Sequence, residues 1–578
     1  MSDCLISADF LDFLLFDWLQ IDSRGAVDRE TSRAIIELGA KLATDDFLPC
    51  YREADIHEPR LDQDGVHILP AIIEALSQFR DLGLFGMSFP EELGGMGLPQ
   101  SLSLAVYSIF ASANISASGY AMLTTGNARL ISTFGTLAQI EAFARPQIDG
   151  RWFGTMCLSE PQAGSSLGDI RTRAIRDGED ELGARYRLVG NKMWISGGDQ
   201  DASDNIVHLV LAKIALEDGS LPEGSQGISL FIVPKRLPDG TRNDVAVAGL
   251  NHKMGNRGTS NCLLNFGEEQ GAIGWLIGSE QQGLAQMFQM MNEARISVGM
   301  GAAALAYRGY RHAVRYAEER SQGRLMGAKG GAPVPIVAHP DVRRMLLQQK
   351  AYGEVAVALC LFCSSLIDEH DEDAEQLLAL LTPIAKSWPS EFGLIANDLA
   401  IQVHGGYGYT RDFDVEQLWR DNRLNPIHEG TAGIQAIDLL GRKILRSDGR
   451  ALALLHDRIE ATSRAAETAT GWSAEVNALR VYSGKVTSVI QGLRGCEGAE
   501  AFDDAIMFLR AFGHGVVAWL MLDMALAAER TGSGPLGVGL VHACRFFIET
   551  ELPQAEAWLG IVDAQSRLVR SAPDEIFA

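Results

Sequence analysis

Residues 420–443 read RDNRLNPIHEGTAGIQAIDLLGRK and place Glu429 between a histidine and a glycine. Pro426 interrupts the backbone just before this carboxylate. The apolar spacing from Ile434 to Leu440 predicts a helix, which the hydroxyl of Thr431 can cap. The start of such a helix suits an oxyanion or a pyrophosphate, and a desolvated carboxylate beside it can remove a proton. The stretch therefore indicates a general base at Glu429, with an ordinary loop glutamate as the alternative.

The composition is that of a large folded protein. With 578 residues, 47% of them hydrophobic and 21% charged, the chain is too long for one core and predicts about two to four domains. The formal net charge of −24 argues against a nucleic-acid partner and against an anionic membrane surface, because both require a basic face. A small anionic ligand remains compatible with this charge, because a few local arginines can outweigh the global field.

The first residues, the most apolar window and the cysteines indicate the compartment. Residues 1–22 are apolar but carry five acidic and no basic side chains, which is the reverse of a targeting peptide. The window from Ala511 to Ala528 contains His514 and Asp523, so it predicts a buried helix rather than a membrane span. The eight cysteines follow no regular spacing, and we expect reduced thiols in a cytoplasmic protein.

Two short motifs have a plain structural interpretation. Cys360 and Cys363 form a C-x-x-C pair, but they lie in an apolar helical run without a second pair, so we expect no metal site. Residues 299–304 match G-x-G-x-x-A, yet the dinucleotide fingerprint requires a preceding strand, and this match lies between helical patterns. Close helix packing through small residues explains it better.

The order of helical and strand patterns predicts a mostly α, α+β fold in five parts. Residues 1–30 have the pattern of an amphipathic arm, and residues 31–152 predict an N-terminal helical domain. Residues 153–283 contain short runs rich in Val, Ile and Leu that predict a small β-barrel or sandwich, with strands at 186–196, 206–214, 227–233 and 245–250. Residues 284–445 predict a helical bundle, and 446–578 an additional C-terminal helical domain of unknown role.

Two spots in the strand section have the chemistry to hold a planar heterocycle. Residues 158–166, LSEPQAGSS, form a loop with hydroxyl and N–H donors, and residues 193–198, MWISGG, place a large flat side chain before a hydroxyl and two glycines. A heterocycle needs an aromatic contact together with hydrogen bonds to its ring atoms. A tryptophan at a strand end inside a domain interface is the alternative.

The order of these motifs is more specific than any one of them. CLSEPQAGSS, WISGG, EAR, EER, QVHGGYGYTRDF and HEGTAGIQ follow one another between about residue 30 and residue 445. In this order they resemble the acyl-CoA dehydrogenase family. The arm with FLLFDWL, the ending GIQAIDLLGRK and the extra C-terminal block resemble a longer subgroup, which includes 3-methylmercaptopropionyl-CoA dehydrogenase and related bacterial enzymes.

The resemblance implies that FAD is the cofactor and that the strand section holds its flavin. It implies contacts from Leu158 and Ser159 to the pyrimidine edge, from Trp194 and Ser196 near flavin N5, and from Ser165 near the phosphates and the nucleotide end of the ligand.

The helical section is implied to carry the base and the remaining contacts. Glu429 matches the catalytic base and Arg295 a substrate-side arginine. The further cofactor positions are Thr431 and Gln435 after the base, Arg320 reaching the pyrophosphate from a neighbouring subunit, and Gln402, Gly405 and Gly406 on the adenosine side across the dimer.

Three positions depart from the family pattern. His428 stands where the family often has an aromatic residue, and Arg320 is followed by SQGR instead of the usual Phe-Gly. Some relatives place the base beside the substrate-side arginine, where this chain has Ala294. Glu293 is one residue away, about 100° round a helix, so we favour Glu429 as the base over Glu293.

The implied reaction is α,β-dehydrogenation of an acyl-CoA to the 2-enoyl-CoA, as in fatty-acid β-oxidation. The implied substrate is a short or medium acyl-CoA or 3-methylmercaptopropionyl-CoA, and the implied electron acceptor is an electron-transfer flavoprotein. A homodimer or a dimer of dimers is expected, without nucleic acid and without a membrane span. The alternatives are an acyl-CoA oxidase that uses oxygen, and a flavoprotein of the same fold without dehydrogenase activity, either DNA-binding or non-catalytic.

Overall fold

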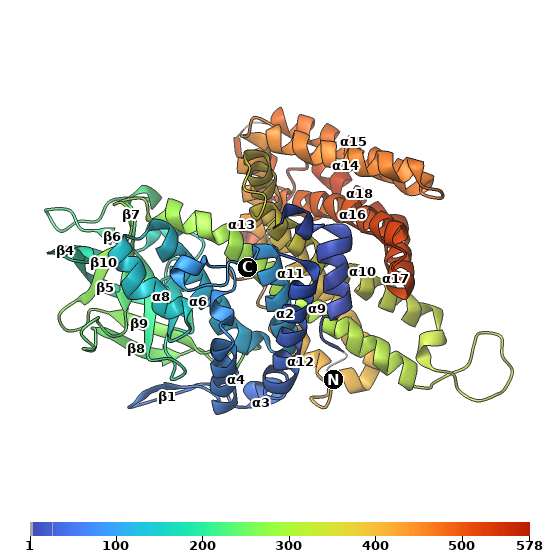
Figure 1. Ribbon diagram of the computed structural model, residues 1–578. Coiled ribbons are helices and arrows are strands. Elements are labelled where there is room, and N and C mark those ends of the chain that lie inside the picture. The colour runs from blue at the N-terminus through green and yellow to red at the C-terminus, as the bar shows by residue number, and fades with distance from the viewer. Residues whose placement is uncertain (1–3, 26, 497) are drawn as a thin grey trace. The chain divides into compact units, whose positions relative to one another are not determined.

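The computed structural model describes residues 4–25, 27–496 and 498–578, and the chain divides into two compact units (Figure 1). The first, which we call the sheet unit, comprises residues 35–99 and 109–294. The second, the helical unit, comprises residues 1–34, 100–108 and 295–578. The sheet unit thus groups most of the predicted N-terminal helical domain with the β-domain. The helical unit groups the arm, the bundle and the C-terminal block.

Short helices and one hairpin precede the sheet. The helices are α2 (Arg29–Leu42), α3 (Tyr51–Ile56), α4 (Pro70–Asp81), α5 (Gln100–Ala113), α6 (Ile115–Phe134), α7 (Leu137–Gln139) and α8 (Arg145–Ile148). Asn114 separates α5 from α6 because its side chain accepts a hydrogen bond from the N–H of Ala117 and caps α6. The hairpin of β1 (Arg60–Asp62) and β2 (Gly65–His67) was not predicted from the sequence.

The middle of the chain forms the predicted β-domain. Its strands are β3 (Trp152–Cys157), β4 (Arg173–Asp180), β5 (Gly183–Ser196), β6 (Asn205–Ile214), β7 (Ile228–Pro234), β8 (Val245–Leu250), β9 (Asn261–Phe266) and β10 (Ala272–Leu276). They hydrogen-bond in the order β10-β7-β6-β4-β5-β9-β8, with β3 also paired to β6. Because β10 pairs with both β7 and β5, five of the strands close on themselves as in a barrel. The predicted strands are confirmed, whereas β4, β9 and β10 were missed.

Alternation along β6 places apolar side chains on both faces of the sheet. Val207, Leu209 and Leu211 belong to a core cluster shared with α6 and the segment after it, and Figure 1 shows α6 and α8 close to the strands. Val210 and Ala212 belong to a second cluster shared with β5, β8 and β9. A strand that buries both faces is nearly continuous in apolar residues. Burial of each such side chain contributes about 1.5–3 kcal/mol.

The helical unit begins with α1 (Ala8–Asp12) and continues after the sheet. Its longer helices are α9 (Gly283–Glu319, which starts in the sheet unit), α10 (Pro340–Ile367), α11 (Glu372–His404), α14 (Arg450–Thr468), α15 (Ser473–Arg494) and α16 (Ala505–Thr531). The shorter ones are α12 (Val415–Asn422), α13 (Ala432–Ile437), α17 (Gly534–Phe546) and α18 (Leu552–Ala564). In Figure 1, α14, α15, α16 and α18 lie side by side, and α13 and α16 are in contact.

The predicted close packing at residues 299–304 is confirmed. Gly299 lies inside α9, and a Cβ at this position would come within 1.9 Å of the carbonyl oxygen of Ala385 in α11. Only glycine allows the two helix backbones to approach this closely.

Within the described part of the chain, two helices are long and apolar enough to span a membrane, namely α10 and α16. Their most apolar windows are 89% and 78% buried within the protein, as is typical of core helices. All eight cysteines lie in described segments and none forms a disulfide. Cys360 and Cys363 are buried in α10, where desolvation raises the pKa of both thiols.

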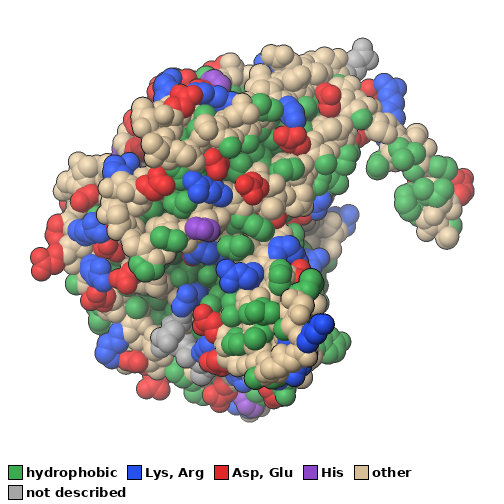
Figure 2. Space-filling model, turned by 90° about the vertical axis from the view of Figure 1, so that its right-hand side faces the viewer, with side chains coloured by type: hydrophobic (Ala, Val, Ile, Leu, Met, Phe, Trp, Pro, Cys, Tyr) green, Lys and Arg blue, Asp and Glu red, His purple; other side chains and the backbone are tan. Residues whose placement is uncertain are grey.

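The N-terminal arm packs on the helical unit of its own chain. Phe10 stacks on Tyr307 of α9, with the ring centroids 5.8 Å apart. The indole N–H of Trp18 donates to a carboxylate oxygen of Asp523 in α16 over 2.8 Å. On the face drawn in Figure 2, acidic and basic side chains are interspersed, so the net negative charge is carried by a mixed surface.

Candidate functional site

The loop after β3 and the end of β5 lie together in the sheet unit. The N–H of Met193 donates to the carbonyl of Ser159 over 3.0 Å. The ammonium of Lys192 donates to the carbonyl of Leu158 over 2.9 Å. Leu158 and Ser159 both remain partly exposed. The two motifs that the sequence indicated for a planar heterocycle are therefore neighbours, fixed by these two hydrogen bonds.

A buried ion pair beneath this loop was not identified from the sequence. Lys192 Nζ lies 3.0 Å from Glu160 Oε1, and the exposed fractions of the two side chains are 0% and 3%. The carboxylate also accepts from the hydroxyl of Thr172 over 2.6 Å and from the N–H of Arg171 over 2.7 Å. Burial alone would raise the pKa of Glu160, but Lys192 and these donors lower it to about 2. The two partners are 32 positions apart, so no local sequence pattern marks them as a pair.

Trp194 has an unusual backbone conformation that presents its ring to solvent. Its φ is +66°, in the left-handed region, and the residue is 58% exposed. It lies where the pairing of β5 with β9 is irregular, between Lys192 and Ile195. A bulge of this kind re-aims a side chain, and left-handed backbone at a non-glycine residue is characteristic of functional sites. The hydroxyl of Ser196 accepts from the side-chain amide of Asn261 over 3.2 Å.

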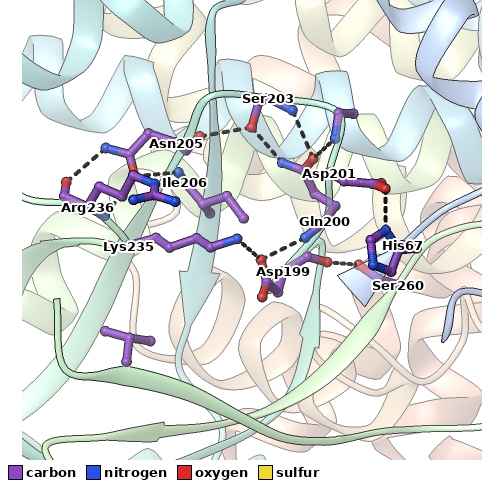
Figure 3. Close-up of polar contacts among 12 residues, drawn as sticks. His67, Asp199, Gln200, Asp201, Ser203, Asn205, Ile206, Lys235, Arg236 and Ser260 are labelled. Carbon is purple, nitrogen blue, oxygen red and sulfur yellow. Dashed lines mark hydrogen bonds and ion pairs between the residues drawn. The ribbon is translucent and has the colours of Figure 1, made fainter. Parts of the chain in front are cut away.

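A polar network supports the turn that follows Ser196 (Figure 3). The N–H of Gly197 donates to the carbonyl of Ser260 over 2.9 Å, and the hydroxyl of Ser260 donates to the carbonyl of Asp199 over 2.7 Å. Lys235 pairs with the Asp199 carboxylate, as Figure 3 shows. The pair and these hydrogen bonds fix the residues that follow Trp194 in the chain, up to Asp199.

The same segment is tied to the β1–β2 hairpin. His67 Nδ1 lies 2.8 Å from a carboxylate oxygen of Asp201. Its Nε2 lies 3.1 Å from Asp62. The hydrogen bond to Asp201 is the main cause that raises the pKa of His67.

Ser165 lies in the same loop as Leu158 and Ser159. It is exposed, between the turn formed by Glu160 and Ala163 and a single helical turn at Leu167–Asp169. As an exposed residue, Ser165 can be reached by a ligand from solvent.

The helical unit holds Glu429 in the turn between α12 and α13. The predicted cap is confirmed, because the hydroxyl of Thr431 accepts from the N–H of Ile434 over 3.4 Å. The predicted helix runs to Ile437 as an α-helix and continues to Leu445 as a π-helix. Gln435 is buried, and its side-chain amide donates to the carbonyl of Glu429 over 3.0 Å.

The carboxylate of Glu429 lies in a desolvated setting with two cations nearby. Burial raises its pKa, and the positive charges of Lys386 and Arg295 partly oppose this rise. The residue as a whole is half-buried, whereas its carboxylate group is desolvated. Lys386, which the sequence analysis did not single out, is fully buried in α11 and donates to the carbonyl of Gly430 over 2.7 Å.

Arg295 is buried and ion-paired. Its Nη1 lies 3.0 Å from Asp438 Oδ2. The neighbouring Glu293, the alternative base, forms an ion pair with Arg129 at 3.5 Å. The two residues adjacent to Ala294 thus have different ion-pair partners, and the charge of Arg295 lowers the pKa of Glu429.

A chain of side-chain amides fixes His428, the residue before the base. Asn397 of α11 donates to the carbonyl of Leu305 over 2.9 Å and accepts from Asn422 over 2.7 Å. Asn422 accepts from Asn425 over 2.9 Å. Asn425 Oδ1 lies 3.0 Å from Nε2 of His428, so it accepts the ring proton. Burial, together with the charge of Lys386, lowers the pKa of His428 to about 3, and the imidazole is neutral.

The residues expected to act across a dimer lie at neighbouring helix ends. Tyr316 in the last turn of α9 stacks on His404 at the end of α11, with ring centroids 4.3 Å apart. Arg320 follows α9, and Gln402, Gly405 and Gly406 lie at the end of α11, all exposed. Gly405 has φ +60°, which explains the glycine there. Gly406 has no described atom within 4 Å of a built Cβ, so packing within the chain does not require it.

Each unit thus holds one part of the predicted site. The sheet unit brings together Leu158, Ser159, Ser165, Trp194 and Ser196, and the helical unit holds Glu429, Thr431, Gln435 and Arg295, with Arg320, Gln402, Gly405 and Gly406 at the helix ends. Among the described residues, no three His, Cys, Asp or Glu side chains gather in a way that would hold a metal ion.

Family models match along most of the chain. The acyl-CoA dehydrogenase N-terminal domain matches residues 21–151, the middle domain 155–268 and the C-terminal domain 281–445. A further model, acetyl-CoA dehydrogenase C-terminal like, matches residues 455–573. The C-terminal block is therefore a recognised domain in its own right.

Characterised relatives match at nearly full length. The chain is 34% identical to 3-methylmercaptopropionyl-CoA dehydrogenase of Ruegeria pomeroyi, over 89% of each chain. It is 31% identical to a broad-specificity linear acyl-CoA dehydrogenase of Mycobacterium tuberculosis, over 94% of each chain.

Solved structures share the fold. ACDH-11 of Caenorhabditis elegans in complex with C11-CoA has a TM-score of 0.78 at 19% identity and covers 99% of this chain and 96% of its own. An acyl-CoA dehydrogenase of Bacillus anthracis complexed with FAD has a TM-score of 0.74 at 21% identity, over 94% and 89%. With the four domain models in register and long relatives above 30% identity, the chain belongs to the acyl-CoA dehydrogenase family, a family of FAD-binding oxidoreductases.

Proposed function

We propose that this chain catalyses the FAD-dependent α,β-dehydrogenation of a saturated acyl-CoA, with Glu429 as the base that removes the α-proton. The observation that carries the proposal is the setting of Glu429. Its carboxylate is desolvated, its pKa is raised, and two buried cations still favour its ionised form. A carboxylate in this state is a stronger base than one in water and titrates closer to the working pH.

The residues present fit FAD. An exposed indole at Trp194 lies on strained backbone beside the hydroxyl of Ser196, and Leu158 and Ser159 offer main-chain and hydroxyl groups at the neighbouring loop. Such a set suits a flavin edge. When bound, FAD supplies the acceptor for the hydride that leaves the β-carbon.

The outer parts of the cofactor would be held by the remaining predicted contacts. We assign Ser165 to the phosphate and nucleotide end of the cofactor. Thr431 and Gln435, which follow the base in the chain, are assigned as further cofactor contacts. Gln435 Oε1 is buried without a hydrogen-bond partner in the described residues, which leaves an acceptor for a ligand donor.

The chain's own groups would perform the first half of the reaction. The α-proton of a thioester is weakly acidic, so its removal needs donors at the thioester oxygen. We assign this task to the backbone N–H of Glu429 together with a hydroxyl of the cofactor. Arg295, held by Asp438, lies on the substrate side and keeps a positive charge near the base.

We further propose that two copies of the chain form the complete site. The open space at Gly406 and the exposed Arg320, Gln402 and Gly405 support a contact to the adenosine and pyrophosphate of a cofactor held by a second copy. Size-exclusion chromatography with light scattering tests this, and a monomer that binds FAD fully would contradict it. We propose an electron-transfer flavoprotein as the electron acceptor.

The substrate is proposed to be a linear acyl-CoA of short or medium length, or 3-methylmercaptopropionyl-CoA. The names of long relatives support this range, because one acts on 3-methylmercaptopropionyl-CoA, one on linear acyl-CoAs broadly, and a third is a butyryl-CoA dehydrogenase of Syntrophomonas wolfei.

An anaerobic titration of the purified flavoprotein with a panel of acyl-CoAs tests the proposal. We expect one or more members to bleach the flavin band, and Glu429→Gln to keep the flavin but lose bleaching. Retained bleaching in Glu429→Gln would overturn the assignment of the base. Rapid re-oxidation of the reduced protein by oxygen alone would favour the oxidase, and a flavin that no thioester bleaches would favour a non-dehydrogenase relative.

A further inference from the structure

Lys386 is a lysine with no exposed surface in the middle of α11. Lysine is almost never fully buried unless it has a specific partner. Its ammonium donates to the carbonyl of Gly430, the residue after the proposed base, over 2.7 Å. The side chain therefore reaches from a long core helix to the turn that carries Glu429.

That turn has a backbone conformation that needs support. Glu429 and Gly430 have φ values of +51° and +90°, so two successive residues are left-handed. A left-handed conformation is sterically unfavourable for a glutamate. The carbonyls of both residues are taken by side-chain donors, Gln435 for Glu429 and Lys386 for Gly430. These two donors hold the turn in the conformation that it would otherwise leave.

The charges around Lys386 come from three elements of the helical unit. On α9, Arg295 repels it, but Asp438 pairs with Arg295 at 3.0 Å. Oδ1 of Asp438 also lies 3.1 Å from Nε of Arg442, so the Asp438 carboxylate pairs with two arginines. In the turn, His428 is neutral and Glu429 is the carboxylate that acts on Lys386. Lys443 follows in the π-helix. Burial lowers its pKa, Asp438 opposes this, and the charges of Arg442 and Arg295 add to it.

We propose that Lys386 is a positioning residue for Glu429, with two separable effects. Its N–H donor keeps the left-handed turn in place, and its positive charge keeps the buried carboxylate ionised and able to accept the α-proton. The inference rests on the proposed function of Glu429 and extends it to a residue 43 positions earlier in the chain.

The ionisation state of Lys386 supports the second effect. Burial lowers its pKa, Glu429 opposes this, and the result is a pKa of about 8. The ammonium is therefore mostly protonated at neutral pH. A nearby opposite charge lowers the pKa of a carboxylate, and Lys386 acts on Glu429 in this direction. Removal of this charge should raise the pKa of Glu429 and leave more of the base protonated at neutral pH.

Three substitutions separate the donor from the charge. Lys386→Met removes both, Lys386→Gln keeps a neutral donor, and Lys386→Arg keeps the charge and a donor. Lys350→Met is the matched control, because Lys350 is a lysine of α10 with a side chain only 16% exposed, and it pairs with Glu354.

The rate of anaerobic flavin reduction is measured against pH for each variant with a substrate that bleaches the wild type. We expect the acidic limb of the profile to move to higher pH by about one unit or more in Lys386→Met and Lys386→Gln. High pH should restore much of the rate in Lys386→Gln. Lys386→Arg and Lys350→Met should keep the wild-type limb.

A second readout needs neither flavin nor substrate. Hydrogen–deuterium exchange of peptides covering residues 423–434 should be several-fold faster in flavin-free Lys386→Met than in flavin-free wild type. Lys386→Gln should exchange at a rate between these two, because its neutral amide donor sits on a side chain one bond shorter than that of lysine. If Lys386→Met does not fold, Lys386→Gln still tests the charge through the pH profile.

The outcomes separate this inference from the function on which it rests. An unchanged acidic limb in both neutral variants, together with unchanged exchange, would overturn the role of Lys386 while leaving Glu429 as the base. A wild-type flavin that no acyl-CoA bleaches would instead overturn the proposed function. An equal loss of rate at all pH values would reduce Lys386 to a purely structural residue.

Discussion

Replacing Lys192 by methionine should destabilise the sheet unit and loosen the loop proposed to hold the flavin. The substitution leaves the carboxylate of Glu160 buried without its cation and removes the donor to the Leu158 carbonyl. In the wild type the pKa of Glu160 falls from its ordinary value of 4.5 to about 2. At about 1.4 kcal/mol for each tenfold change in a protonation constant, this difference corresponds to about 3 kcal/mol of stability at neutral pH.

Loss of one partner from a buried pair typically costs about 3–5 kcal/mol, which agrees with this magnitude. For a unit of about 250 residues, each kcal/mol lowers the melting temperature by about 2–4 °C, so Lys192→Met should melt about 6–20 °C below the wild type. Thermal unfolding followed by near-UV circular dichroism at pH 7 measures this, and flavin content measures the effect on the loop. Lys213→Met is the matched control, because Lys213 is also buried but donates to the carbonyl of Gly168.

The dependence on pH has a definite sign. Because the pKa of Glu160 is lowered by folding, its contribution is fully present above pH 4.5 and is lost as the pH falls from 4.5 toward 2. The stability difference between the wild type and Glu160→Gln should therefore shrink in this window. A Lys192→Met protein that melts within about 2 °C of the wild type and binds flavin normally would refute the reasoning.

Three further perturbations test other parts of the structure. Asn422→Ala should lower the melting temperature and slow flavin reduction, because it leaves two buried amides without partners at about 1–3 kcal/mol each; an unchanged rate would contradict the role of the amide chain. Gly299→Ala should lower the yield of folded protein, since its methyl would meet the Ala385 carbonyl, and wild-type melting would refute the clash. Asp201 raises the pKa of His67, so protease protection of the hairpin should be complete below pH 6.5 and fall as the pH passes the raised value; His67→Ala should show no such pH dependence.

Local sequence patterns predicted the parts of the fold that depend on near neighbours. Short runs rich in Val, Ile and Leu located β6 and β7, and a hydroxyl before an apolar run located the cap at Thr431. By contrast, β4 reads RAIRDGED and is largely exposed, so it lacks the apolar signal of a strand and is held by its pairing with β5 and β6. Such a strand exists because of its neighbours and not because of its own residues.

The candidate site likewise contains residues that the sequence identified and residues that only the structure revealed. Glu429 could be identified because its own surroundings in the sequence carry a recognisable pattern. Lys386 and Glu160 could not, because a buried charge is explained only by a partner that folding brings close. Asn397 and Asn422 have no periodicity that marks them as members of one hydrogen-bonded chain. Sequence reasoning therefore finds the reacting group before it finds the groups that set its geometry and charge.

The hydrogen bond between Trp18 and Asp523 has a consequence for how the protein is made. The two residues are 505 positions apart, so the arm must wait for a partner that is synthesised 505 residues later. At synthesis rates of about 5–20 residues per second, the wait is on the order of half a minute to two minutes. During this time Phe10, Phe13 and Leu14, which are buried in the finished protein, have no finished core to cover them. The sheet unit, whose segments end at residue 294, can fold while the arm waits. A chaperone that covers the apolar side chains of the arm would be needed until the segment around Asp523 is made.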